Sequence, residues 1–314
     1  MNRLEKMGPL VGLLAVFVLF SLLRPEQFPR TANIEIMMLQ TTVVGIAALG
    51  MTLVIISGGI DLSVGSVIAL TTVVVASLLN QGWSPVAAAT GGIAAGALCG
   101  TISGLLITRL RLAPFIVTLG LWGALRGTAK GLANEQMVMA PTTWLNQLLT
   151  TLPDDRRWML FPPGVWLLVV LALIMGGVLR YTRFGRHIFA IGSNEQTARL
   201  CGVAVERQKL FVYMLGSGLA GLAGVLQFSY LTVGDPTTAA GMELDIIAAV
   251  VIGGASLSGG EGRILGSIIG ALIMTTVSNG CTKMEYPNWV QEIVTGGIII
   301  AAVTIDRFRH RKRV

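Results

Sequence analysis

The sequence predicts an all-α membrane protein with about ten transmembrane helices, and three observations lead to this fold class. Only 12% of the 314 residues are charged, 53% are hydrophobic and the mean hydropathy is +0.74, whereas an average soluble domain has about 25% charged residues. Apolar runs recur along the chain with the length of about 17–25 residues that a helix needs to cross a bilayer. No soluble domain fits between these runs, so residues 1–314 are expected to form a single transmembrane domain.

The predicted helices are apolar runs bounded by Gly, Pro or charged residues. Ser84 and Pro85, for example, are typical of an N-cap and a first helical residue. The first run resembles a signal peptide, but it lacks a small-x-small cleavage site and many apolar runs follow, so we expect an uncleaved helix. The predicted ranges are 8–23, 34–57, 63–80, 85–107, 112–131, 163–179, 209–231, 243–256, 264–281 and 288–305.

The distribution of Lys and Arg predicts the orientation of the chain in the membrane. With ten helices and a cytoplasmic N-terminus, 16 of the 23 basic residues fall in cytoplasmic segments, six of them in the loop 180–209. Because basic residues are retained in the cytoplasm, both termini are expected there. The net charge of +7 then reflects topology and attraction to anionic membrane lipid, and no nucleic-acid partner is expected.

The cysteines and histidines favour neither a disulfide framework nor a metal site. Cys99, Cys201 and Cys281 are odd in number and far apart, and His187 and His310 lie in separate basic segments. None of them has the spacing of metal ligands. We therefore expect no metal and no cofactor.

Acidic residues are absent from the centres of the predicted helices. The predicted ranges place four acids at external helix ends and Asp306 at a cytoplasmic end; the four are Asp235, Glu243, Asp245 and Glu292. Proton-coupled carriers usually keep ionisable groups near the middle of the membrane. This class of carrier is disfavoured, whereas a sodium-coupled carrier or a passive channel stays open.

Glycine-rich segments give three further signals. Leu257–Glu261 reads LSGGE, close to the LSGGQ element of ABC ATPases, but ATP hydrolysis also needs a phosphate-binding loop that ends in Gly-Lys, and no Gly-Lys pair occurs. Gly253–Ser258 and Gly58–Ser63 share the pattern G-G-x-x-L-S, a weak internal repeat of a kind found in transporters. A glycine at every fourth position predicts close helix packing along Gly92, Gly96, Gly100 and Gly104.

A glycine-rich break at membrane depth is tolerated only where it is buried in protein or lines a cavity. Asp61 follows such a break, and it either caps the next helix or lies beside a transport pathway. Polar residues inside predicted helices either hydrogen-bond between helices or line the pathway: Gln40, Thr41, Thr42, Thr52, Thr118, Gln227, Ser229, Thr275, Thr276 and Asn279. The residues selected for the pathway are Asp61, Ser63, Thr118, Gln227 and Asn279.

The loop 180–209 is the longest predicted cytoplasmic segment. Ser193 and Gln196 have capping-box spacing, and Gly202 suits a left-handed helix stop, so one short helix is predicted at about 194–201. Two helical turns are unstable alone in water. We expect this helix to dock on a cytoplasmic partner; the alternative is that it lies on its own protein or on lipid headgroups.

Four stretches together resemble the permease subunits of bacterial ABC sugar importers of the ribose, xylose and galactose type. They occur in the family's order between about residues 35 and 306, and they are Gly50–Ser66, Leu112–Gly127, Thr182–Val203 and Ala248–Leu272. The resemblance implies a homodimer in the bacterial inner membrane, served by an extracytoplasmic sugar-binding protein and driven by separate ATPase subunits. It also identifies LSGGE as a motif of the permease family. The external stretch 135–163 has no close match.

The resemblance further implies that Thr182–Val203 is the coupling segment, which fits into a cleft of the ATPase. The matched coupling positions are Arg183, Gly185, Arg186, Asn194, Glu195, Ala198 and Gly202. The expected function is import of a ribose-like monosaccharide, with no bond broken by the permease itself. Two alternatives stay open: an ABC permease for another small solute, and a stand-alone secondary carrier or channel.

Overall fold

The computed structural model describes the backbone of residues 3–311 and the surroundings of residues 8–304. All ten predicted helices are found within this range: α1 (Arg3–Leu23), α2 (Thr31–Ile56), α3 (Val64–Asn80), α4 (Pro85–Arg109), α5 (Pro114–Leu132), α6 (Pro163–Tyr181), α9 (Val205–Leu231), α10 (Met242–Ile252), α11 (Ile264–Lys283) and α12 (Asn288–Arg311). Two further helices, α7 (Arg183–Ser193) and α8 (Glu195–Leu200), lie between α6 and α9. The predicted all-α fold is confirmed.

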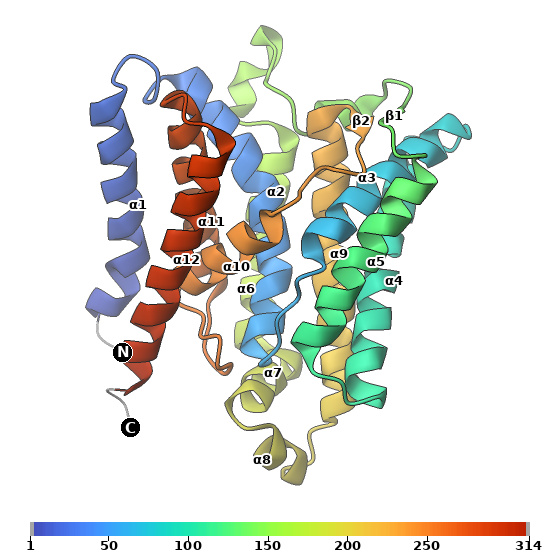
Figure 1. Ribbon diagram of the computed structural model, residues 1–314, viewed down its shortest axis with the longest axis vertical. Helices are drawn as coiled ribbons and strands as arrows, with labels where there is room; N and C mark the ends of the chain where they lie inside the picture. The colour runs from blue at the N-terminus through green and yellow to red at the C-terminus, as the bar shows by residue number, and fades with distance from the viewer. Residues whose placement is uncertain (1–2, 312–314) are drawn as a thin grey trace.

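The long helices form a bundle around α2 and α9 (Figure 1). α2 is buried along almost its whole length, and it packs against α6, α9, α10 and α11. α9 packs along α4 on its other side. Outer helices expose large apolar side chains, such as Leu22, Leu173 and Ile300, as a surface in contact with lipid requires. Among the described residues, five helical segments, including α2, α4, α9 and α11, have the length and apolarity of membrane spans.

Two of the predicted spans are interrupted. α10 has 11 residues, which gives a length of about 16 Å against a hydrocarbon core of about 30 Å. α10 alone is therefore too short to span the membrane. The predicted helix range 243–256 is wrong at its end, because the helix stops at Gly253 and the chain continues in an irregular turn. α3 likewise begins inside the bundle, where the linker after α2 climbs from the α7 end to the middle of the molecule (Figure 1).

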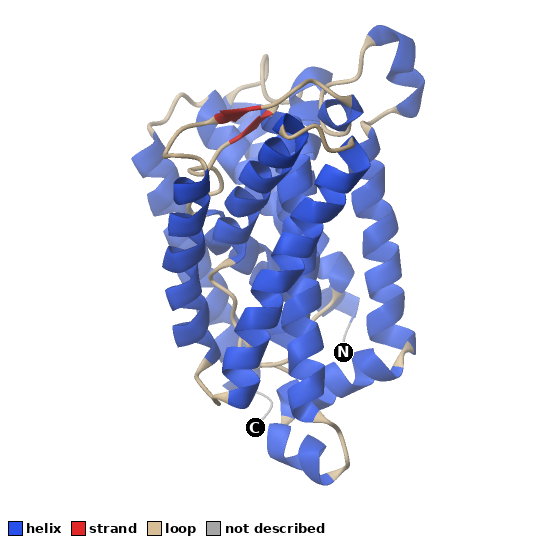
Figure 2. Ribbon diagram, turned by 90° about the vertical axis from the view of Figure 1, so that its right-hand side faces the viewer, coloured by secondary structure: helices blue, strands red, loops and turns tan. Residues whose placement is uncertain are grey.

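The two ends of the bundle differ in structure. One end holds α7 and α8, and α1 begins and α12 ends on the same side (Figure 1). The opposite end holds the segment after α5, with two 3₁₀ helices, Trp144–Gln147 and Asp154–Met159. There the strands β1 (Val138–Met139) and β2 (Val233–Gly234) pair antiparallel, as Figure 2 shows.

Candidate functional site

α7 and α8 form a helical hairpin that projects from one end of the bundle (Figure 2). The hydroxyl of Thr182 accepts a hydrogen bond from the backbone N–H of Gly185 at the start of α7, 3.1 Å away. Asn194 caps α8, because its Oδ1 accepts from the N–H of Thr197 at 2.9 Å. The predicted N-cap, Ser193, is instead the last residue of α7. The prediction of a single helix in this loop is thus wrong, whereas the predicted left-handed stop at Gly202 is confirmed.

The hairpin has its own small core and a set of ion pairs. Ile191, Ala198 and Val205 are buried against one another, so α7, α8 and the start of α9 are held together. Glu195 accepts from Lys209 at 2.6 Å and pairs with Arg199 at 3.4 Å, and Arg199 also pairs with Glu206. The hydrogen bond from Lys209 lowers the pKa of Glu195. A two-turn helix that is unstable alone is stabilised here by its neighbours.

The structure divides the predicted coupling residues into two groups. Five are exposed on the hairpin, namely Arg183, Arg186, Asn194, Glu195 and Gly202, whereas Gly185 and Ala198 are buried. A Cβ at Gly185 would lie 2.2 Å from the carbonyl oxygen of Leu179, so this glycine allows α6 and α7 to approach. Sequence reasoning missed Leu200, whose side chain is 88% exposed at the end of α8.

Four glycines connect the hairpin to the two interrupted regions of the bundle; we call Gly58, Gly192, Gly259 and Gly260 the glycine junction. A Cβ at Gly192, near the end of α7, would lie 1.8 Å from the carbonyl oxygen of Ile56 and 2.4 Å from the N of Gly260. The N–H of Gly260 also donates to that Ile56 oxygen at 2.9 Å. The end of α2, the end of α7 and the turn before α11 therefore meet through backbone atoms.

The junction requires glycine for a second reason. Gly58, Gly259 and Gly260 have φ values of +80°, +85° and +75°, in the left-handed region that other residues rarely adopt. The LSGGE stretch, which includes Gly259 and Gly260, lies in the turn between α10 and α11. Its glycines form a tight contact with α7 within the same chain.

Three predicted pathway residues meet at the linker between α2 and α3. Oδ1 of Asp61 accepts from the backbone N–H of Ser63 at 2.8 Å and from its hydroxyl at 2.6 Å. The hydroxyl of Ser217 on α9 donates to Oδ2 of Asp61 at 3.4 Å. Thr118 on α5 donates to the carbonyl oxygen of Ile60 at 3.1 Å. These bonds hold an irregular segment inside the bundle and satisfy its buried polar groups.

The beginning of α3 also faces an acidic residue. Glu243 is buried at the start of α10, and a Cβ at Gly65 would lie 2.4 Å from its Oε2. Its Oε1 accepts from Nε1 of Trp122 on α5 at 3.1 Å. The prediction of Glu243 at an external helix end is wrong because α10 begins within the bundle. A carboxylate is favoured there by the partial positive charge at the start of α3.

The remaining predicted pathway residues have different surroundings. Asn279 accepts a hydrogen bond from Asn33 at 2.9 Å, which joins α11 to α2. The same two helices are joined by hydroxyl pairs, Thr41–Thr275 at 2.6 Å and Thr52–Ser267 at 2.7 Å. Such bonds between helices are typical of membrane bundles.

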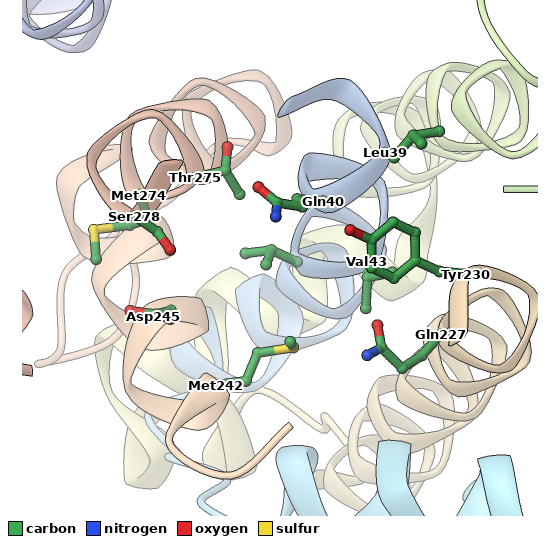
Figure 3. A pocket seen from close by; sticks show the side chains of 11 residues that line it. Leu39, Gln40, Val43, Gln227, Tyr230, Met242, Asp245, Met274, Thr275 and Ser278 are labelled. Atoms are coloured by element: carbon green, nitrogen blue, oxygen red, sulfur yellow. The ribbon is translucent and has the colours of Figure 1, made fainter. Parts of the chain in front are cut away.

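Gln227, in contrast, lies in a cavity. The cavity has a volume of about 200 Å³ and lies between α2, α9, α10 and α11, in the half of the bundle away from α7 and α8. Figure 3 shows Gln227 and Tyr230 extending from α9, and Gln40 from α2, toward α10 and α11.

A bundle with interrupted helices, a projecting hairpin and an internal cavity is the architecture of a transport protein. The family described as "Branched-chain amino acid transport system / permease component" matches residues 33–303. The chain belongs to this permease family. The permease is therefore a multi-pass membrane protein.

Individual relatives of this permease match along nearly its whole length. The ribose import permease protein RbsC of Bacillus subtilis is 40% identical over 97% of this chain and 93% of its own. The L-arabinose ABC transporter permease protein AraH of Azospirillum brasilense is 34% identical, over 99% and 90%. The D-allose transport system permease protein AlsC of Escherichia coli is 34% identical, over 96% and 92%. These relatives are transport permeases and not enzymes, and no solved structure matches the chain.

Proposed function

We propose that this permease is the membrane subunit of an ABC importer and carries a ribose-like monosaccharide across the bacterial inner membrane. The names of relatives that align along nearly the whole chain support the sugar as cargo. The observation that carries the coupling role is the glycine junction, because it joins the projecting hairpin directly to both interrupted regions. The permease breaks no bond itself; a separate ATPase subunit supplies the energy.

Coupling follows from the geometry of the hairpin. ATP binding in the partner moves α7 and α8, and the junction transmits this displacement to the end of α2 and to the turn before α11. Contacts that differ between two conformations are what shift the equilibrium between outward-open and inward-open states. Leu200 fills the partner's cleft, since an apolar side chain that is 88% exposed at the end of a helix gains most from being covered.

The proposed coupling is tested by substituting Leu200. Leu200→Glu should remove the stimulation of ATPase activity and the ATP-dependent uptake of D-ribose, while the yield of membrane-inserted protein stays normal. Leu200→Met, which keeps the apolar contact, serves as the matched control and should transport normally. Full coupling in Leu200→Glu would exclude this residue from the interface.

The orientation proposed is that α7, α8 and both termini face the cytoplasm. The balance of basic residues supports it, and α1 begins and α12 ends on the same side as the hairpin (Figure 1). Cys201 provides a direct test, because it is exposed beside α8 while Cys99 and Cys281 are buried. A membrane-impermeant maleimide should label Cys201 in permeabilised cells and leave it unlabelled in intact cells. Labelling of Cys201 in intact cells would mean that the hairpin faces the outside.

We propose that the permease forms a homodimer through α5. Four glycines on this helix have no neighbour on their surface, because a Cβ added at any of them would meet no atom of the described residues within 4 Å; they are Gly120, Gly123, Gly127 and Gly131. Small residues allow close approach between helices of two copies, whereas lipid gains nothing from them. Gly123→Cys should form a disulfide-linked dimer in membranes, and Leu173→Cys on the exposed face of α6 should not. The reverse pattern would place the interface elsewhere.

The end of the bundle opposite the hairpin is the proposed docking side for an extracytoplasmic sugar-binding protein. A second candidate function is permeation of a branched-chain amino acid, which is favoured by the description of the matching family. Reconstitution with the ATPase and a ribose-binding protein separates these possibilities. D-Ribose uptake should require ATP and both partners; uptake by the permease alone would mean a stand-alone carrier, and uptake of leucine in place of ribose would support the second candidate.

A further inference from the structure

The cavity between α2, α9, α10 and α11 has room for a small solute and a mixed polar and apolar lining. Its volume of about 200 Å³ is more than ten times the space of about 10–15 Å³ that one water molecule needs. Six of its lining side chains carry hydrogen-bonding groups: Gln40, Gln227, Tyr230, Asp245, Thr275 and Ser278. They come from four different helices and surround one space (Figure 3).

One polar atom of the lining has no hydrogen-bond partner among the described residues. Oε1 of Gln40 is buried and accepts no hydrogen bond from any described residue. In contrast, Gln227 donates to the hydroxyl of Thr238 at 2.9 Å, and Ser278 accepts from Gln291 at 2.5 Å. Some side chains are thus held in place by the protein, while a buried amide oxygen beside the cavity is left for a donor from outside, since buried polar atoms are normally hydrogen-bonded.

The lining favours a neutral ligand with several hydroxyl groups. Amides and hydroxyls both donate and accept hydrogen bonds, and the carboxylate of Asp245 is a strong acceptor. The lining can therefore bind hydroxyl groups of a ligand, which also donate and accept. No Lys, Arg or His lines the cavity among the residues that the structure describes. The carboxylate of an amino acid would therefore have no basic side chain of the lining to pair with. The apolar residues of the lining, such as Val43 and Met242, suit the C–H faces of a sugar ring.

We propose that this cavity binds a polyhydroxylated solute within a single copy of the chain, in the half of the bundle away from the ATPase. The proposal rests on the proposed function and adds a place where the sugar is held after entry. Hydrogen bonds to Gln40, Tyr230 and Asp245 retain the solute, and each is weak enough for release, as transport requires.

Protection of a thiol tests occupancy directly. In purified permease with Cys201→Ser, the variant Ser278→Cys places a thiol in the cavity, while Cys99 and Cys281 stay buried. D-Ribose should slow modification of this thiol by a small methanethiosulfonate several-fold, and L-valine should not. The matched control is Trp158→Cys, on a residue that is 79% exposed outside the cavity, where ribose should have no effect. Equal rates with and without ribose, or protection by valine alone, would overturn the proposal.

Transport by cavity variants gives a second readout, and it separates this proposal from the proposed function. Gln40→Leu and Tyr230→Phe should each lower ATP-dependent ribose uptake about threefold to tenfold, the effect of one lost hydrogen bond. Stimulation of the ATPase should persist, because the hairpin is unchanged. Gln81→Leu, on an exposed residue at the end of α3, is the control. Normal uptake in both cavity variants would refute the cavity site alone, whereas absence of ATP-dependent uptake in the unmodified permease would refute the proposed function.

Discussion

The glycines of α4 and those of α5 have similar spacing but opposite surroundings. On α4, a Cβ at Gly100 would lie 2.2 Å from the carbonyl oxygen of Tyr213, and one at Gly96 would lie 2.6 Å from that of Ser217. On α5, a Cβ at Gly120, Gly123, Gly127 or Gly131 would meet no atom within 4 Å in the part of the chain that the structure describes. The stripe on α4 is filled by α9 of the same chain, and the stripe on α5 is open.

This difference shows what a glycine stripe in a sequence can and cannot predict. Small residues indicate that another backbone comes close, but the sequence does not state whether that backbone belongs to the same chain. For Gly96, Gly100 and Gly104 the partner is α9, whereas Gly92 lies closest to side chains of α3. The predicted close packing is confirmed. For α5 the proposed partner lies outside the chain, which is the basis of the proposed dimer.

The largest effect is expected from a side chain placed in the filled stripe. Gly100→Leu puts its Cβ against the backbone of Tyr213, so α4 and α9 must separate, and the loss of stability should exceed about 3 kcal/mol. The permease should then be recovered mainly as aggregate in size-exclusion chromatography after detergent extraction. Gly123→Leu on α5 is the matched control and should give a monodisperse protein. Equal recovery of both variants would remove the distinction between the stripes.

A smaller effect is expected at the glycine junction, where a substitution to alanine adds one methyl group close to the backbone of Ile56. Gly192→Ala should push α7 away from α2 and cost about 1–3 kcal/mol of this contact. ATP-dependent uptake should fall about tenfold, with the amount of membrane-inserted protein reduced much less. Gly177→Ala on α6, where a Cβ meets nothing within 4 Å, should transport normally. If Gly192→Ala transports as well as Gly177→Ala, the glycine junction does not transmit movement from the hairpin.

Substitution in the open stripe should affect association and leave folding intact. A Cβ at Gly127 meets no described atom within 4 Å, so the free energy of unfolding of the Gly127→Leu protomer should change by less than about 0.5 kcal/mol, as for a surface substitution. In the Gly123→Cys background it should lower the fraction of disulfide-linked dimer. If Gly127→Leu leaves the dimer fraction constant and instead unfolds the protomer, the glycines of α5 pack within the chain and do not form the dimer interface.

An effect confined to the local stability of one short helix is expected where contacts involve ion pairs and no close backbone approach. Glu195→Gln should lower the local stability of α8 by no more than about 1 kcal/mol, because solvent screens these charges. Since Lys209 lowers the pKa of Glu195, the stabilisation is fully present above the ordinary glutamate value of about 4.3 and is lost as pH falls through the lower folded pKa. This stabilisation is measured as the hydrogen-exchange protection of the α8 amides at pH 7 and below pH 4. Identical protection at the two pH values would contradict the prediction.

The sequence predicted the helices well, because apolar runs and their Gly and Pro boundaries are local signals. It missed α7, although Phe184, Ile188 and Ile191 have the spacing of an amphipathic helix; the basic residues among them favoured a loop instead. It also missed that α10 is only half a span, since hydropathy does not reveal at which depth a helix begins.

The candidate site could be predicted only in part. Asp61, Ser63 and Thr118 meet at one linker, and the glycine-rich break indicated a special position there. Gln227 lies in the cavity, but Tyr230 and Asp245 could not be selected, because the cavity depends on how four helices are rotated about their axes. No pattern within a single helix carries that information.

The linker between α2 and α3 has a final consequence for the cost of movement. Residues 57–63 are already outside any helix, and their polar groups are bonded to side chains such as those of Asp61 and Thr118. The main-chain hydrogen bonds that a continuous helix would form at these residues are thus already absent in the folded state. In the proposed transport cycle, a change in the tilt of α3 would therefore need no helical turn to unwind at this linker, and none of the energy from ATP would be used for that purpose.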